Sequence, residues 1–160
     1  MIEIYPSMPS ERPDIERVTR AAGNFHGDEL STPLELFDGY LRDPKASGYN
    51  FLSARLDGRV VGFTCYGPTP LTEATYDLYW IVTEAGAQGR GVGRRLFEST
   101  IAIIKDDGGR LLMIWTSGTP EYENARAFYQ RMGCQLEARI TDFYRRDDDL
   151  CIFSFRISQG

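Results

Sequence analysis

The clearest candidate for chemistry is at residues 88–95, where the sequence reads Gln-Gly-Arg-Gly-Val-Gly-Arg-Arg. Alternating glycines let successive backbone N–H groups face one ligand, because glycine adopts the positive-φ conformations that such a turn requires. A helix that follows adds partial positive charge at its first residues, and Arg90, Arg94 and Arg95 add full charges. The pattern predicts a phosphate or pyrophosphate site. The simpler alternative is a tight strand-to-helix turn whose arginines only improve solubility.

Two familiar phosphate-binding motifs do not fit this stretch. A P-loop requires Gly-x-x-x-x-Gly-Lys followed by Ser or Thr, and the sequence has no such run. A dinucleotide fingerprint requires Gly-x-Gly-x-x-Gly, whereas Arg94 stands where the third glycine would follow Gly89 and Gly91. What remains is Gln-x-x-Gly-x-Gly, which begins at Gln88 and ends at Gly93.

The elements around this turn follow from hydrophobic periodicity and from helix start and stop signals. Strands are predicted at residues 2–5, 49–56, 60–66, 75–83, 111–116, 135–144 and 150–157. Helices are predicted at residues 10–22, 34–41, 92–105 and 120–132. Pro33 opens the second helix, Thr119 caps the fourth, and Gly133 suits the left-handed residue that ends it. The order β-α-α-β-β-β-α-β-α-β-β predicts a mixed α/β sheet flanked by helices.

Composition excludes several classes of protein. Hydrophobic residues make up 42% of the 160 residues, which is typical of a globular chain. No linker divides the sequence, so we expect residues 1–160 to form a single domain. The 18 Lys and Arg are outnumbered by 23 Asp and Glu, giving a net charge of −5, so no nucleic-acid partner is expected.

Targeting and metal signals are also missing. No apolar run approaches the roughly 20 residues of a membrane helix, so no membrane partner is expected. Glu3, Pro6 and Pro9 interrupt any signal peptide, so we expect a cytoplasmic protein. One histidine and three cysteines without a Cys-x-x-Cys pair predict neither a metal site nor a disulfide framework. We therefore expect Cys65, Cys134 and Cys151 to be core residues.

A second motif in the fourth predicted helix reads Ala-Arg-Ala-Phe-Tyr-Gln-Arg-Met-Gly-Cys, at residues 125–134. Together with Gln88, Gly91 and Gly93, it resembles the two ordered motifs of the GCN5-related N-acetyltransferases. The resemblance implies a mixed, mostly antiparallel sheet and acetyl-coenzyme A, or less often a longer acyl-coenzyme A, as donor. It also implies the transfer of the acyl group to an amine.

The resemblance assigns cofactor contacts to two backbone segments. The N–H groups of the glycine turn would surround the pyrophosphate, and the end of the preceding strand would pair with the pantetheine arm as an edge strand pairs with a peptide. The implied residues are Ile81, Val82, Thr83, Gln88, Gly89, Arg90, Gly91, Val92, Gly93 and Arg94. One departure is Tyr122, at a position where the family often has an asparagine; the nearby Asn124 falls on another side of the helix.

Tyr129 matches the tyrosine that in many family members protonates the leaving thiolate. A phenol with a reference pKa of about 10 can donate a proton and stay neutral near pH 7. The alternative is a tyrosine that only packs beside Phe128.

Asp77 is the candidate general base, because some family members carry a catalytic glutamate on this strand. Regular alternation would place Thr75, Asp77, Tyr79 and Ile81 on one face, where burial would raise the pKa of the carboxyl group. Aspartate is the shorter acid, so a water relay would be needed. The alternatives are a positioning role, hydrogen bonds at the strand end, or no dedicated base.

Other polar and aromatic residues are weaker candidates. Tyr66, Tyr79 and Tyr144 are expected to line an acceptor pocket, although each type of residue is more often a packing residue. His26 is a lone loop histidine of a kind that is usually exposed or hydrogen-bonded. The run of aspartates at residues 147–149 is expected to be a solvated turn.

These expectations predict an acetyl-coenzyme A-dependent N-acetyltransferase that acts on a primary amine of a small molecule by direct attack in a ternary complex. One alternative is an enzyme that acetylates proteins or peptides. Another is a module that binds coenzyme A without catalysis, because a fold does not fix a function. A monomer or a homodimer is expected.

Overall fold

The structure of this chain is a computed structural model that describes residues 1–23, 25 and 27–158. Its strands are β1 (Ile2–Pro6), β2 (Asn50–Leu56), β3 (Arg59–Pro68), β4 (Thr75–Thr83), β5 (Leu111–Ser117), β6 (Gln135–Arg145) and β7 (Asp148–Arg156). Its α-helices are α1 (Arg12–Ala21), α2 (Ser31–Arg42), α3 (Pro44–Ser47), α4 (Val92–Asp106) and α5 (Glu123–Arg131). Short 3-10 turns are η1 (Pro9–Glu11), η2 (Gly27–Leu30), η3 (Ala85–Ala87) and η4 (Pro120–Tyr122).

Over the described residues the strands form one sheet in the order β1-β2-β3-β4-β5-β7-β6. The pair β4–β5 is parallel, and the other neighbouring pairs are antiparallel. The expected mixed, mostly antiparallel sheet is therefore confirmed. The parallel pair arises because the crossover through α4 returns the chain to the same end of the sheet.

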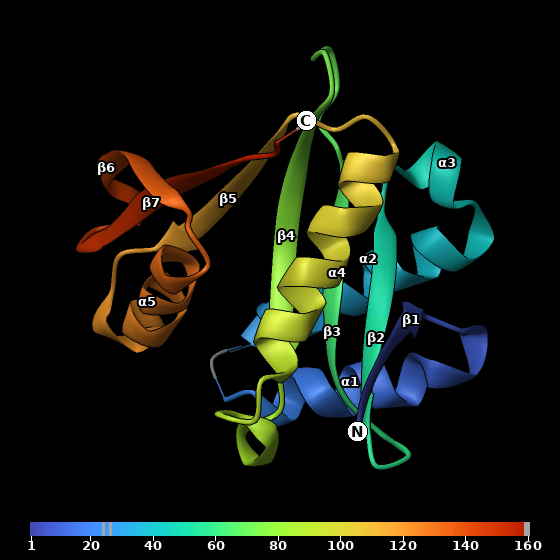
Figure 1. Cartoon of the computed structure of the whole chain (residues 1–160). Helices are drawn as coiled ribbons and strands as arrows, with labels where there is room; N and C mark the ends of the chain where they lie inside the picture. Colours follow the sequence, from blue (N-terminus) through green and yellow to red (C-terminus); the bar gives the residue numbers. More distant parts are fainter. Residues whose placement is uncertain (24, 26, 159–160) are drawn as a thin grey trace.

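Helices cover both faces of the sheet, so the fold has three layers (Figure 1). Helix α4 lies on the face where Leu96 and Ile104 are fully buried in the larger core cluster. Helices α1 and α2 lie on the opposite face and bury Val18 and Phe37 in a second cluster. Apolar side chains on both faces of β3 and β4 join the two cores, which fixes the sheet between the helices.

Strand β4 contains a β-bulge at Tyr79. Cys65 of β3 lies opposite Trp80, and the next residue, Tyr66, lies opposite Leu78, which leaves Tyr79 as the extra residue. After such an extra residue, each side chain lies on the face opposite to the one that uninterrupted alternation would give it. Ile81 therefore packs in the core cluster beneath α4, whereas Asp77 lies opposite Gly67 on the other face. The predicted placement of these residues on one face is wrong.

Strands β4 and β5 pair only at their beginnings. The ladder runs from Thr75 opposite Leu111 to Leu78 opposite Ile114 and then stops. Beyond this point β5 diverges from β4, and the half-sheet of β5, β7 and β6 turns away with α5 (Figure 1). Among the described residues, no strand therefore neighbours the second half of β4 on its β5 side.

Several element boundaries differ from the sequence predictions. Helix α2 begins at Ser31, so Pro33 is its third residue, and the short α3 was not predicted. The predicted fourth helix divides into η4 and α5, and Gly133 follows with φ +94°, as predicted. In the part of the chain that the structure describes, no helix is long and apolar enough to cross a membrane.

Candidate active site

A cavity of about 1380 Å³ lies where β4 and β5 diverge. The glycine turn and the end of β4 form one part of its lining, and α5 contributes Tyr129 and Phe128. The other part comes from the end of β5, the β6–β7 hairpin and the segment between α1 and α2. The cavity therefore joins both halves of the sheet.

The glycine turn presents a row of unused backbone donors to this cavity. Gly89 and Gly91 have φ values of +79° and +84°, and no atom lies within 4 Å of where a Cβ would stand on either. None of the N–H groups of residues 89–94 donates a hydrogen bond to any described residue. Free N–H groups at the start of α4, together with the helix dipole, make this turn a fitting site for a pyrophosphate.

Gly93 contributes to the site by close packing. A Cβ on Gly93 would lie 3.3 Å from Cε1 of Phe128. The absence of a side chain therefore lets α5 approach the first turn of α4. This contact holds the helix that carries Tyr129 against the glycine turn.

The end of β4 offers free backbone groups on the β5 side. Residues 81–83 pair with β3 on one side and line the cavity on the other. Val82 is buried in the cluster beneath α1 and α2, and Ile81 packs against the cluster beneath α4 on the other face, so both side chains are structural. The Gln88 side chain donates from Nε2 to the Thr83 carbonyl at 3.4 Å, which links the strand end to the turn.

Tyr129 is buried in the wall of the same cavity, with 8% of its surface exposed. Its ring lies 5.6 Å from that of Phe128 and 5.9 Å from that of Phe153, measured between centroids. Its hydroxyl makes no hydrogen bond within the described chain. Burial raises the pKa of Tyr129 far above its usual value, so the phenol stays protonated at ordinary pH.

The remaining predicted residues divide between the cavity and other parts of the molecule. Tyr79 and Tyr144 line the cavity, as do nine of the ten predicted cofactor residues; the exposed Arg90 does not. Tyr66 is buried in the core beneath α4 and lies outside the cavity. Burial raises the pKa of Tyr66 to about 12.

Asp77 also lies outside the cavity. It lies opposite Met113 in the part of β4 that still pairs with β5, before the lining residues of this strand begin at Tyr79. Its carboxylate accepts a hydrogen bond from the Thr69 hydroxyl at 2.7 Å. This bond corresponds to the strand-end role that the sequence left open as an alternative. Asp77 is not among the residues that line the cavity with Tyr129.

Asp148 is a lining residue that the sequence prediction missed. The aspartate run was expected to be solvated, yet Asp148 is 7% exposed and begins β7. Its carboxylate accepts from the Ser117 hydroxyl at 2.5 Å and from the Arg145 guanidinium at 2.7 Å. The signal available in the sequence was alternation, because Asp148 shares its face with Leu150.

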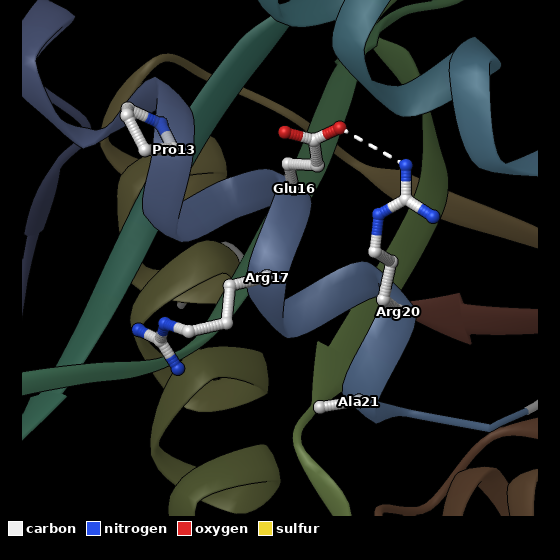
Figure 2. A pocket seen from close by; sticks show the side chains of 5 residues that line it. All are labelled: Pro13, Glu16, Arg17, Arg20 and Ala21. Carbon is white, nitrogen blue, oxygen red and sulfur yellow. Dashed lines mark hydrogen bonds and ion pairs between the residues drawn. The ribbon is translucent and has the colours of Figure 1, made fainter.

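Other candidates do not add to the site. Cys65, Cys134 and Cys151 are buried free cysteines, and His26 lies outside the described residues. A separate surface hollow on α1 is lined by Pro13, Glu16, Arg17, Arg20 and Ala21 (Figure 2). Glu16 pairs with Arg20, while Arg17 turns away and donates to the Glu84 carboxylate at 2.6 Å, which ties α1 to the end of β4.

The glycine turn has free N–H groups that can bind a pyrophosphate, and it lies beside a strand edge without a paired strand. Binding of a coenzyme A donor requires this arrangement. The sequence matches the Acetyltransferase (GNAT) family over residues 15–134. The chain belongs to the GNAT acetyltransferase family. A GNAT-family protein from Desulfovibrio desulfuricans has a crystal structure that matches with 37% sequence identity and a TM-score of 0.94, over 99% of this chain and 100% of that one.

More distant GNAT structures share the fold. The ribosomal-protein-S18-alanine N-acetyltransferase from Escherichia coli has 18% identity and a TM-score of 0.78, with 100% and 96% of the two chains covered. An aminoglycoside 6'-N-acetyltransferase complexed with coenzyme A has 16% identity and a TM-score of 0.77, with 99% and 97% covered. No curated protein matches the sequence.

The family assigns this GNAT protein a general activity. It is an N-acetyltransferase that uses acetyl-coenzyme A as acyl donor. One of the two distant relatives is named for a ribosomal protein and the other for an aminoglycoside. The shared fold therefore leaves the acceptor to be argued from the cavity.

Proposed function

We propose that this protein transfers an acetyl group from acetyl-coenzyme A to a primary amine of a small molecule. Both substrates are bound together, and the amine attacks the thioester carbonyl directly. The observation that carries the proposal is that the buried, unpartnered Tyr129 and the free N–H groups of residues 89–94 line one cavity. A donor anchored at the turn and held along β4 then has its thioester end beside a protonated phenol.

The backbone of residues 81–94 binds acetyl-coenzyme A. The turn offers N–H groups to the pyrophosphate, and the free edge of β4 offers backbone groups to the amide-containing pantetheine arm. Neither contact requires a side-chain charge. Arg94 lines the cavity but pairs with Glu98 at 2.7 Å, so we assign it a supporting role.

Tyr129 supplies the proton that the leaving thiolate takes. Its raised pKa keeps the proton on the phenol until the carbon–sulfur bond breaks. The incoming ammonium must lose one proton before its nitrogen can attack. Asp77 lies outside the cavity, so we assign this proton to water in the cavity rather than to Asp77.

The walls at the acceptor side favour a small molecule over an extended peptide. Phe25 and Glu29 come from the segment between α1 and α2, and Tyr144 comes from the β6–β7 hairpin. Segments far apart in the sequence thus contribute to this end of the cavity, which leaves less room for an internal lysine, whose chain continues in two directions, and for the chain that follows a peptide N-terminus.

The test is thiol release from acetyl-coenzyme A in the presence of polyamines, aminoglycosides, amino acids, aralkylamines and short peptides. We expect at least one small primary amine to be acetylated, with the product confirmed by mass spectrometry. Initial rates at varied concentrations of both substrates should give intersecting lines, as a ternary complex requires. Acetylation of peptides alone, or parallel lines from a covalent acetyl-enzyme, would contradict the proposal.

A further inference from the structure

Three aromatic side chains are exposed together at the edge of the cavity. Trp115 of β5 is 53% exposed, and Phe143 and Tyr144 of β6 are 45% and 42% exposed. The ring of Phe143 lies 5.7 Å from that of Trp115 and 5.1 Å from that of Tyr144, measured between centroids and perpendicular in both cases. An exposed aromatic cluster of this kind marks a surface that binds something apolar.

This cluster is continuous with the candidate active site. Trp115 and Tyr144 line the same cavity as Tyr129, whereas Phe143 supports both rings from outside it. The cluster is therefore a wall of the acceptor side and not a separate face of the molecule. An apolar group placed on it would be part of the molecule that enters the cavity.

Asp148 adds a fixed negative charge beside this wall. Its side chain is only 10% exposed, and the Ser117 hydroxyl and Arg145 guanidinium hold its two oxygens. Ser117 in turn accepts a hydrogen bond from the Thr119 N–H at 3.1 Å, which orients the hydroxyl toward the carboxylate. An oriented carboxylate in a partly dry cavity binds an ammonium far better than a surface carboxylate does.

The charge on Asp148 is only partly neutralised. Arg145 pairs with it, but the Arg145 side chain is 71% exposed, so solvent screens its contribution. The carboxylate therefore retains the capacity to accept from a second cation. Tyr122 and Tyr144, whose own pKa values are raised mainly by burial, present ring surfaces that also favour a cation.

We propose that Asp148, Trp115 and Tyr144 select an acceptor that carries its ammonium group on an aromatic or bulky apolar body. The body lies on Trp115 and Tyr144, and the ammonium lies at Asp148 before it gives up its proton. This inference rests on the proposed acetyl transfer to a small amine. It narrows the acceptor to amphipathic monoamines, as opposed to hydrophilic polyamines, for which the carboxylate of Glu29 or Glu121, the other acidic lining residues, would have to provide a second anionic contact.

The experiment compares 2-phenylethylamine with 1,4-diaminobutane as acceptors in the same assay. We expect kcat/KM to be at least about 10-fold higher for 2-phenylethylamine, the preference that one well-packed apolar group confers. Trp115→Ala should remove most of this preference by raising the KM for 2-phenylethylamine, with the KM for acetyl-coenzyme A unchanged. Ile140→Ala is the matched control, because Ile140 is similarly exposed at 44% on the same half-sheet but lies outside the cavity.

Asp148 is tested by two variants with opposite expected effects. Asp148→Asn should raise the KM for 2-phenylethylamine at least about 10-fold, because a charged hydrogen bond is lost. Arg145→Gln should lower that KM, because it removes the cation that competes with the acceptor. If Asp148 only supports the hairpin, Arg145→Gln will leave the KM unchanged or raise it, and the inference is overturned.

The outcomes also separate this inference from the proposed function. If the protein binds acetyl-coenzyme A but acetylates no small amine, the proposed function fails. If it acetylates 1,4-diaminobutane as well as or better than 2-phenylethylamine, acetyl transfer stands and the amphipathic acceptor is excluded. The amphipathic acceptor is also excluded if Trp115→Ala leaves the preference for 2-phenylethylamine over 1,4-diaminobutane unchanged.

Discussion

Gly93 in the first turn of α4 and Phe128 in α5 lie against each other in the lining of the cavity. A Cβ on Gly93 would stand 3.3 Å from Cε1 and 3.5 Å from Cζ of the Phe128 ring, closer than most Cβ contacts in proteins. The second glycine of the Gln-x-x-Gly-x-Gly motif therefore serves helix packing, whereas the space around Gly91 is open. The two glycines of one motif have different physical roles.

Gly93→Ala tests this packing role. The added methyl group must displace Phe128 by a few tenths of an ångström, and we expect a loss of about 1–3 kcal/mol in the free energy of unfolding, as overpacking usually costs. Urea denaturation measures the loss. The double variant with Phe128→Leu should recover part of it, and simple addition of the two losses would contradict a direct contact.

Gly91→Asp tests the anion site. We expect acetyl-coenzyme A to raise the melting temperature of the wild-type protein by ligand linkage, and this increase should disappear when a carboxylate faces the bound pyrophosphate. Gly108→Asp is the matched control, because Gly108 has nearly the same φ, +85° against +84°, and equally open space around its Cβ position. In each variant the free energy of unfolding should fall by roughly 1 kcal/mol, because a side chain is strained in the left-handed conformation. In Gly108→Asp, however, acetyl-coenzyme A should still raise the melting temperature.

Tyr129→Phe tests the proton donor. The hydroxyl has no hydrogen bond to lose within the described residues, so we expect folding and coenzyme A binding to be preserved while kcat falls about 10- to 1000-fold. Tyr66→Phe, at a buried tyrosine outside the cavity, should leave kcat unchanged. Equal kcat values for Tyr129→Phe and wild type at saturating substrates would restrict Tyr129 to packing.

Asp77→Asn tests the corrected position of this carboxylate. Because the side chain bonds to Thr69 and lies outside the cavity, we expect the pH profile of kcat/KM to be unchanged. Stability should fall by no more than about 1 kcal/mol, since the asparagine oxygen can still accept from Thr69. A rate that falls near neutrality and recovers at high pH would instead restore Asp77 as the general base.

Alkaline pH should destabilise the fold through buried tyrosines. Burial raises the pKa of Tyr66 to about 12, whereas a tyrosine in an unfolded chain titrates near 10. The stabilising contribution is therefore complete below about pH 10 and is lost as the pH rises toward 12, by up to about 1.4 kcal/mol per pH unit. Urea denaturation across this range should show a shallower decline for Tyr66→Phe than for wild type; identical slopes would exclude a contribution from Tyr66.

The sequence predicted those parts of the fold that depend on local signals. Residues 75–83 were predicted with the bounds that β4 has, because seven of the nine residues in that segment are aromatic or β-branched. Gly133 was predicted as a left-handed residue because a helix that ends there needs one. The glycine turn was also predicted from local residues, because Gly89 and Gly91 themselves permit its positive φ angles.

Features that depend on contacts between distant segments escaped prediction. The bulge at Tyr79 is a matter of register between β3 and β4, and it placed Ile81 on the face opposite to Asp77, where alternation had predicted a shared face. Asp148 looked like part of a solvated turn until Ser117, 31 residues away, was found to hold its carboxylate. Both features depend on strand pairing and burial, which the neighbouring residues in the sequence do not indicate.

The extra residue in β4 gives this strand one position at which its length can change without a change of register. Deleting Tyr79 would leave Leu78 and Trp80 opposite the same residues of β3 and would keep Ile81 and Val82 in their different core clusters. Such a chain should have a straighter β4, because a bulge adds local bend and twist to its strand. We therefore expect any change in the length of β4 among homologous chains to occur at Tyr79.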